Sequence, residues 1–192
     1  MVQPLLLLLG MKASLVFASL VTMTAAAHAE PVRYVQTDVM LGGSAPVVGP
    51  NLLGSVSAGH LLTPGLWAHG ELAGGLAADD QGGGSNVQAH AGVETRGCTA
   101  GRAVCAMVGL DAGVLRGSWM SHESQGMRED VTAGVIVPRF GIDAGGQRVR
   151  ARLGLEIDEA FAGKRTSSYD TSSSSPAGTV GAELSAGVAY QW

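Results

Sequence analysis

The sequence predicts an all-β protein, an eight-stranded antiparallel up-and-down transmembrane barrel. Apolar and polar residues alternate through eight segments of strand length, and this period of two places alternate side chains on opposite faces of a strand. The connections between segments alternate between compact turns and longer polar loops. The last segment has an apolar face and a polar face and ends on Trp192, as expected for a strand with lipid on one side and a lumen on the other.

The first four predicted strands are residues 32–41, 53–62, 66–77 and 86–95. The first sets Val35, Thr37, Val39 and Leu41 against Tyr34, Gln36 and Asp38, and the second alternates less cleanly. Thr63-Pro64-Gly65 is a tight-turn signal that separates the second strand from the third. In the third and fourth strands, His69, Glu71 and His90 occupy the polar face.

The last four predicted strands are residues 104–115, 130–142, 148–161 and 181–192. The fifth alternates apolar residues with Asp111 and glycines. The apolar face of the sixth is expected to consist of Val131, Ala133, Val135 and Val137. The seventh and eighth alternate most regularly, with apolar residues at every second position from 149 to 157 and from 182 to 192.

The connections differ in length on the two sides of the predicted barrel. Those after the second, fourth and sixth strands are compact and cover residues 63–65, 96–103 and 143–147. The others are mostly longer and rich in Gly, Ser, Asp and Pro, and cover residues 42–52, 78–85, 116–129 and 162–178. Outer-membrane barrels have short periplasmic turns and longer extracellular loops. Both ends of the barrel chain are therefore expected in the periplasm.

The C-terminal segment resembles the last strand of bacterial outer-membrane barrels. The matching positions are Leu184, Val188, Tyr190 and Trp192, and in that class the final aromatic and the alternation before it serve as an assembly signal. Together with the predicted architecture, the resemblance extends to the eight-stranded OmpA-type and OmpX-type barrels. It implies outer-membrane lipid and the barrel assembly machinery as partners, and it leaves any partner at the cell surface unknown.

The N-terminal segment resembles a cleaved secretory signal peptide. Met11-Lys12 opens a cationic region, residues 13–26 are small and apolar, and Ala27-His28-Ala29 fits a cleavage site before Glu30. The sequence thus divides into a signal peptide, 1–29, and a barrel, 30–192, with Met11 as the predicted start. The alternative is a membrane anchor over residues 5–27, but Lys12 and several hydroxyl residues interrupt it.

Two cysteines, Cys98 and Cys105, flank a turn that contains Gly101. Export to an oxidising compartment favours a disulfide between them. In the chain-entropy account, closing so small a loop contributes about 2.5 kcal/mol, so the bond would fasten a turn without determining the fold. The alternative is a pair of buried free thiols.

The polar faces of the predicted strands carry charges of both signs. An eight-stranded barrel is only wide enough for side chains to fill, and opposite charges buried there must pair. Arg150 and Arg152 are the expected cationic centre of a lumen network, and the candidate partners are Glu71, Asp111, Glu156 and Glu183. His69 and His90 are expected to form hydrogen bonds there. In the alternative, a soluble sandwich, this face would meet water.

Five aromatic residues fall near the predicted periplasmic strand ends, where an interfacial girdle is expected: Tyr34, Trp67, Phe140, Tyr190 and Trp192. Tyr34 and Trp67, however, have the parity of the lumen. Two explanations are open: bulges turn them outward, or they cap the lumen.

The expected function is that of a small non-enzymatic barrel with a structural, adhesive or surface-interaction role. No catalytic residue, metal site or cofactor motif is assigned, and 16 acidic against 12 basic residues give no sign of nucleic-acid binding. A soluble lipocalin-like barrel with an apolar ligand is the main alternative. His122, Ser124 and Glu129 suggest a remote similarity to lipid A deacylases, but their spacing departs from that family.

Overall fold

The computed structural model describes residues 31–43, 50–78, 82–121, 128–168 and 173–192 of the 192-residue chain. Almost all of this part is β-structure. The strands are β1 Arg33–Gly43, β2 Asn51–Thr63, β3 Leu66–Ala78, β4 Gly82–Cys98, β5 Val104–Ser121, β6 Arg128–Gly145, β7 Val149–Ser167, β8 Ser173–Ser174 and β9 Val180–Gln191. A short 3-10 turn, η1 Ala100–Arg102, lies between β4 and β5.

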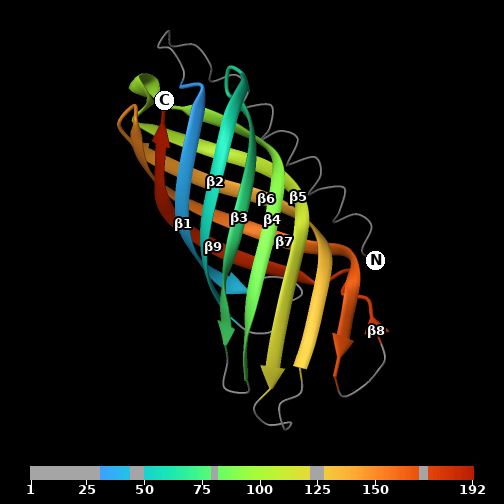
Figure 1. Ribbon diagram of the computed structural model, residues 1–192. Coiled ribbons are helices and arrows are strands. Elements are labelled where there is room, and N and C mark those ends of the chain that lie inside the picture. Colours follow the sequence, from blue (N-terminus) through green and yellow to red (C-terminus); the bar gives the residue numbers. More distant parts are fainter. Residues whose placement is uncertain (1–30, 44–49, 79–81, 122–127, 169–172) are drawn as a thin grey trace, which may run out of the picture.

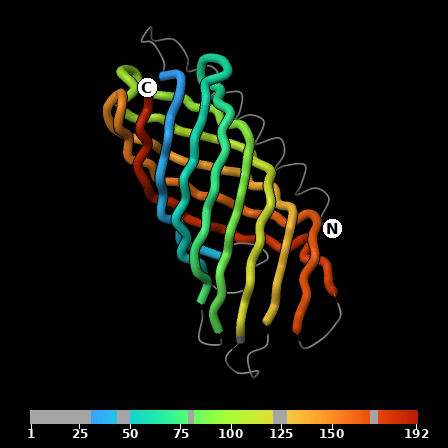
Figure 2. The backbone as a smooth tube through the Cα atoms, viewed as in Figure 1, coloured from blue at the N-terminus to red at the C-terminus, as the bar shows by residue number. Residues whose placement is uncertain are grey.

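The eight long strands form a closed antiparallel barrel (Figures 1 and 2). Each strand from β1 to β7 pairs with the next, β7 pairs with β9, and β9 pairs with β1. Closure leaves no unpaired edge among these strands, which satisfies the backbone groups internally. The predicted fold class, an eight-stranded antiparallel up-and-down barrel, is therefore confirmed.

The two ends of the barrel differ, as the connection lengths predict. At the end called here the turn end, Pro64-Gly65 joins β2 to β3, η1 joins β4 to β5, and residues 146–148 join β6 to β7. The C-terminus also lies at the turn end (Figure 1), where the backbone of Trp192 hydrogen-bonds to Val32 and Arg33. The opposite end, called here the loop end, carries the other connections.

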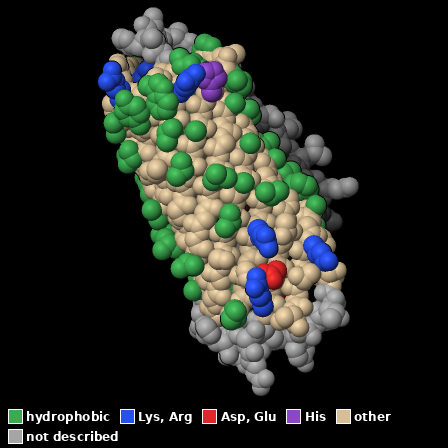
Figure 3. Space-filling model, viewed as in Figure 1, with side chains coloured by type: hydrophobic (Ala, Val, Ile, Leu, Met, Phe, Trp, Pro, Cys, Tyr) green, Lys and Arg blue, Asp and Glu red, His purple; other side chains and the backbone are tan. Residues whose placement is uncertain are grey.

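Large apolar side chains cover the outer wall of the barrel. Every long strand contributes exposed ones, among them Val39, Val56, Leu72, Val87, Leu110, Ile142, Leu153 and Leu184. Figure 3 shows such side chains along the visible face, with Lys and Arg side chains near its two ends. The buried charged side chains, among them Glu71, Arg139 and Glu156, lie inside the barrel. In the part of the chain that the structure describes, no helix is long and apolar enough to cross a membrane.

The prediction for the sixth strand was wrong about its face. Val131, Ala133, Val135 and Val137 are buried inside the barrel, whereas Phe140 and Ile142 lie on its outer wall. Both faces of β6 carry apolar residues, so alternation alone could not assign them.

Several strands also extend farther toward the loop end than expected. β4 begins at Gly82 instead of 86, and β5 continues to Ser121 instead of 115. β6 begins at Arg128, β7 continues to Ser167, and the two-residue β8 pairs with this extension of β7. The residues that look like polar loops in the sequence therefore form ladders that continue the barrel wall.

Candidate functional site

The lumen is the best-defined polar site, and its charges fall into two groups. The group near the turn end centres on Arg96 of β4. Its Nε lies 2.8 Å from an oxygen of Glu94, and its Nη1 lies 3.8 Å from Asp143. Arg152 of β7 lies 3.7 Å from Glu94 and 3.9 Å from Asp143. Three strands thus bring two cations and two carboxylates together.

Two aromatic rings close the lumen beside this group. Tyr34 of β1 and Trp67 of β3 are fully buried, and their ring centroids lie 5.4 Å apart. The guanidinium of Arg96 lies 4.4 Å from the centroid of Tyr34 and 4.6 Å from that of Trp67, within the range of a cation–π interaction. The ring of Tyr34 lies against Gly59, where a Cβ would overlap it. Tyr34 and Trp67 have the parity of the lumen because they point inward and cap it, which is the second of the two explanations considered from the sequence.

Arg150 makes a separate contact set at the turn end. Its Nε donates to Asp143, and its Nη1 donates to the carbonyl oxygens of Arg102 and Gly146 at 2.8 and 3.2 Å. Since carbonyl oxygens are accepted hydrogen-bond partners of a buried guanidinium, Arg150 ties two turns to the barrel wall. It is an anchor of the turn end.

The second charged group lies near the middle of the barrel and centres on Arg139 of β6. Its Nη2 lies 2.6 Å from Glu71 and 2.7 Å from Glu156, and its Nη1 lies 3.1 Å from Asp111. His69 Nε2 lies 2.9 Å from both Asp111 and Arg139. One guanidinium therefore holds three carboxylates from three strands.

These contacts correct the predicted network. All six predicted residues, Glu71, Asp111, Arg150, Arg152, Glu156 and Glu183, are buried in the lumen. The cation bound to Glu71, Asp111 and Glu156 is however Arg139, and Arg150 and Arg152 lie with Asp143 and Glu94. Arg139 and Asp143 were missed because they have the same parity as Val131, Val135 and Val137, which were taken as the lipid face. His90 is buried beside Glu71 as its register partner.

The two charged groups almost touch. A cavity of about 20 Å³ separates them, lined in part by Glu94, Arg139, Arg152 and Glu156, and this is room for about one water molecule. Side chains thus fill the polar part of the lumen.

Acidic residues continue toward the loop end. Glu183 of β9 faces Glu156 directly across the β7–β9 ladder and accepts a hydrogen bond from Asn51 at 3.5 Å. Asp158 is fully buried, and among the described residues neither of its carboxylate oxygens has a hydrogen-bond partner. This region of the lumen therefore holds more acidic than basic side chains.

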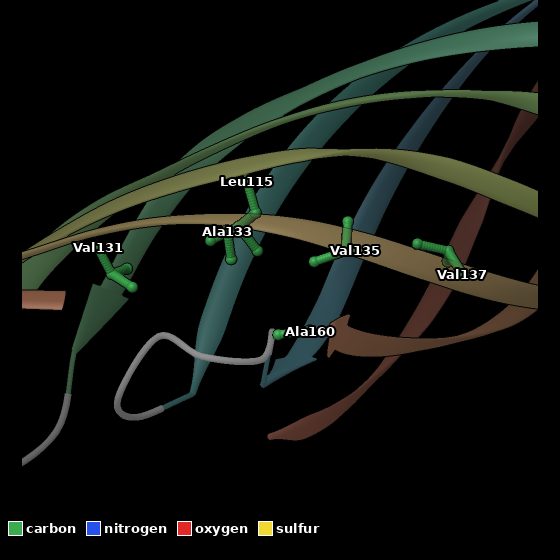
Figure 4. Packing of buried hydrophobic residues seen from close by; sticks show 6 residues of the cluster. All are labelled: Leu115, Val131, Ala133, Val135, Val137 and Ala160. Carbon is green, nitrogen blue, oxygen red and sulfur yellow. The ribbon is translucent and has the colours of Figure 1, made fainter. Parts of the chain in front are cut away.

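Beyond these acids the lumen contains two apolar clusters, together with the buried amides of Asn86 and Gln88. One cluster joins Met40, Leu53 and Ala73. A larger one, shown in Figure 4 along β5, β6 and β7, consists of Leu115, Val131, Ala133, Val135, Val137 and Ala160. Apolar side chains thus supply much of the packing in the loop-end half of the lumen.

The predicted disulfide between Cys98 and Cys105 is present. The two cysteines are direct register partners where β4 and β5 approach η1. Of the five expected girdle residues, Phe140, Tyr190 and Trp192 are about half exposed on the outer wall, and the rings of Tyr190 and Trp192 lie 5.7 Å apart.

Other predicted features fall where the structure gives no test. His122 and Ser124 of the deacylase-like pattern, and the whole predicted signal peptide, lie outside the described residues. Glu129 lies on β6 at the loop end. Among the described residues, no group of three or more His, Cys, Asp or Glu side chains could hold a metal ion.

Comparison with known proteins gives a consistent picture of the fold. No protein-family model and no curated protein matches the sequence. Neisserial surface protein A (NspA) matches with a TM-score of 0.63 and 16% identity, over 83% of this chain and 97% of that one. The N-terminal barrel of Pseudomonas aeruginosa OprF matches with a TM-score of 0.52 and 13% identity, over 85% and 100% of the two chains.

The fold is that of the small outer-membrane barrels. Ail, the attachment invasion locus protein of Yersinia pestis, shares it with a TM-score of 0.52 and 10% identity, over 85% of this chain and all (100%) of that one. At these identities, the similarity to small outer-membrane barrels establishes the architecture alone, and the role of this chain must come from its own residues.

Proposed function

We propose that this protein is a small non-enzymatic β-barrel of the bacterial outer membrane, exported with a cleaved signal peptide, with a structural, adhesive or surface-interaction role. The observation that carries the proposal is the distribution of side chains in the barrel wall. Large apolar residues are exposed on every long strand, whereas ion-paired arginines and carboxylates are buried inside. An exposed apolar area of this extent is stable only against lipid or another apolar surface.

The filled lumen supports a role that does not involve transport of large solutes. Porins that pass such solutes have many more strands and an open channel. Here Tyr34, Trp67 and Arg96 occupy the turn end, and the apolar cluster around Val135 occupies the loop-end half. The wall and the loops are then the parts left to act on other molecules.

An adhesive role is supported by analogy only. Ail is named for attachment and invasion, and it has been solved in complex with the heparin analogue sucrose octasulfate. In this proposal the surface function lies at the loop end, because this end faces the exterior when the turn end faces the periplasm. No assembly partner beyond the barrel assembly machinery is proposed.

The lipocalin-like alternative requires the opposite arrangement of side chains. A soluble barrel that carries an apolar ligand has an apolar cavity and a polar outer wall. The outer wall here exposes residues such as Leu72, Leu76 and Leu153 at 66–68% of their surface. Its lumen near the turn end is charged, and its loop-end half is filled.

The test is fractionation of cells that express the full chain. The expected result is recovery in the outer-membrane fraction, release only by detergent, and a folded form whose gel mobility changes on heating. N-terminal sequencing of that form should begin at Glu30. Recovery as a soluble monomer without detergent would overturn the proposal and return the lipocalin-like alternative.

A further inference from the structure

The outer wall of β5 changes character abruptly toward the loop end. From Val104 to Val114 its outward residues are all apolar; the next outward residues are the exposed Arg116 and then Ser118, before Met120 near the end of the strand. Ten residues of a strand span about 33 Å, or about 25 Å along the axis of a tilted barrel. This equals the height of the apolar band of an outer-membrane barrel. Arg116 therefore lies where hydrocarbon gives way to lipid headgroups.

Two more cations lie on the same face. Arg116 of β5 is the register partner of Thr132 on β6, and Thr132 is the register partner of Lys164 on β7. With neighbouring strands about 4.8 Å apart, the Cα atoms of Arg116 and Lys164 are about 10 Å apart. Arg128 lies farther along β6 toward the loop end. All three side chains are exposed, and Figure 3 shows Lys and Arg side chains gathered around an acidic one toward this end.

The face has an excess of positive charge. Arg128 forms an ion pair with Asp130 at 3.0 Å, and this hydrogen bond lowers the pKa of Asp130 and keeps it ionised. Within the described part of the chain, neither Arg116 nor Lys164 lies within ion-pair distance of an acid, although the positive charge of Arg116 also favours the ionised form of Asp130. The nearest other exposed acid on β7 is Glu159, closer to the apolar band. Two of the three cations are therefore available to an external anion.

We propose that Arg116, Arg128 and Lys164 bind the phosphate groups of phosphorylated lipids in the outer leaflet. The inference rests on the proposed outer-membrane location, which puts these side chains at headgroup depth. Guanidinium groups donate two parallel hydrogen bonds to phosphate oxygens. A basic side chain at an anionic membrane surface also gains affinity from the surface potential. A soluble sulfated polysaccharide would need no such alignment with the edge of the apolar band.

The test compares two double variants of the full barrel, folded in zwitterionic detergent. Arg116→Gln/Lys164→Gln removes the two unpaired cations at the loop end. Arg33→Gln/Arg148→Gln removes the same charge from exposed positions at the turn end. The probe is fluorescent diphosphorylated lipid A in mixed micelles, with its dephosphorylated form as the reference lipid. Heat-dependent gel mobility verifies that all variants are folded.

The loop-end variant should bind diphosphorylated lipid A about 30-fold more weakly than the parent, because each basic group contributes a factor of about five at an anionic surface. The turn-end variant should bind diphosphorylated lipid A as tightly as the parent does. Binding of the dephosphorylated lipid should be the same for the parent and both variants. Equal binding by both variants, or equal binding of both lipids, would overturn the inference while leaving the outer-membrane location intact. If the loop-end variant lost binding to heparin but not to diphosphorylated lipid A, the inference would also fail, because the cations would then bind a soluble polyanion. A parent chain that is soluble without detergent would overturn both proposals.

Discussion

The guanidinium of Arg139 on β6 lies 2.7 Å from the carboxylate of Glu156, its register partner on β7. The same guanidinium holds Glu71 and Asp111. Arg139→Ala would leave three buried carboxylates without their cation, and breaking buried pairs of this kind costs about 3 to 5 kcal/mol. The urea midpoint of the detergent-folded barrel should fall accordingly. Arg148→Ala, at an exposed position, is the control and should leave the midpoint near that of the parent; equal midpoints for both variants would contradict the central role of Arg139.

Arg152→Ala should destabilise the barrel less than Arg139→Ala does. The ion pairs of Arg152 are long, at 3.7 Å to Glu94 and 3.9 Å to Asp143. Arg96 still contacts Glu94 and Arg150 still contacts Asp143 when Arg152 is removed. The expected loss is about 1 to 3 kcal/mol, the cost of disturbing a buried polar contact. The same urea titration measures it, and a loss larger than that of Arg139→Ala would reverse the ranking of the two groups.

Asp158→Asn should stabilise the barrel. Asp158 is fully buried, and its carboxylate has no hydrogen-bond partner among the described residues while Glu183 and Glu71 repel its charge. Removing that charge is expected to raise the free energy of unfolding by about 1 to 3 kcal/mol. The matched control is Asp111→Asn, which removes a charge that Arg139 holds and should lower stability. If both substitutions lowered the unfolding midpoint, an unrecognised cation would have to neutralise Asp158.

Gly187→Ala should impair closure of the barrel. Gly187 of β9 faces Asp38 of β1 across the closing ladder, and a Cβ there would overlap the Asp38 carboxylate and the carbonyl oxygen of Thr37. Overpacking of this kind costs about 1 to 3 kcal/mol or more. The control is Gly54→Ala, where a Cβ has no neighbour within 4 Å. The measurement is the fraction of chain that acquires heat-modifiable mobility, which should drop for Gly187→Ala alone.

Deletion of Trp192 should reduce assembly into the outer membrane far more than Gln191→Ala. Trp192 is exposed on the outer wall beside Tyr190, whereas Gln191 points into the lumen. Only the aromatic belongs to the surface that resembles the assembly signal of outer-membrane barrels. Quantitative fractionation of the two variants measures the difference. Equal assembly of the two would remove the role of the terminal aromatic.

The sequence predicted the strands best where one face is apolar and the other polar. In β7, Leu153 and Leu155 alternate with Arg152 and Glu156, and the assignment of faces was correct. In β6 the inward Val135 and Val137 are as apolar as the outward Ile136. Alternation carries no information when both faces are apolar, and this is why Arg139 could not be found from the sequence.

The lengths of the strands at the loop end were underestimated for a different reason. Gly82, Gly83 and Ser85 of β4 have the composition of a loop. Their backbone nevertheless pairs with Ser118 to Ser121 of β5. Above the apolar band, a ladder requires only backbone hydrogen bonds, and polar or small side chains suffice on its outer face. Composition therefore marks the edge of the band and not the end of the strand.

The disulfide has a consequence for the alignment of the wall. Cys98 and Cys105 are direct partners at one end of the β4–β5 ladder, so the bond permits only one alignment of these two strands. A slip by one residue would exchange the faces of a strand and would turn Glu94 and Arg96, or Asp111, outward into hydrocarbon. A covalent link that fastens a short turn thus also protects the lumen charges against mispairing while the chain is not yet a closed cylinder.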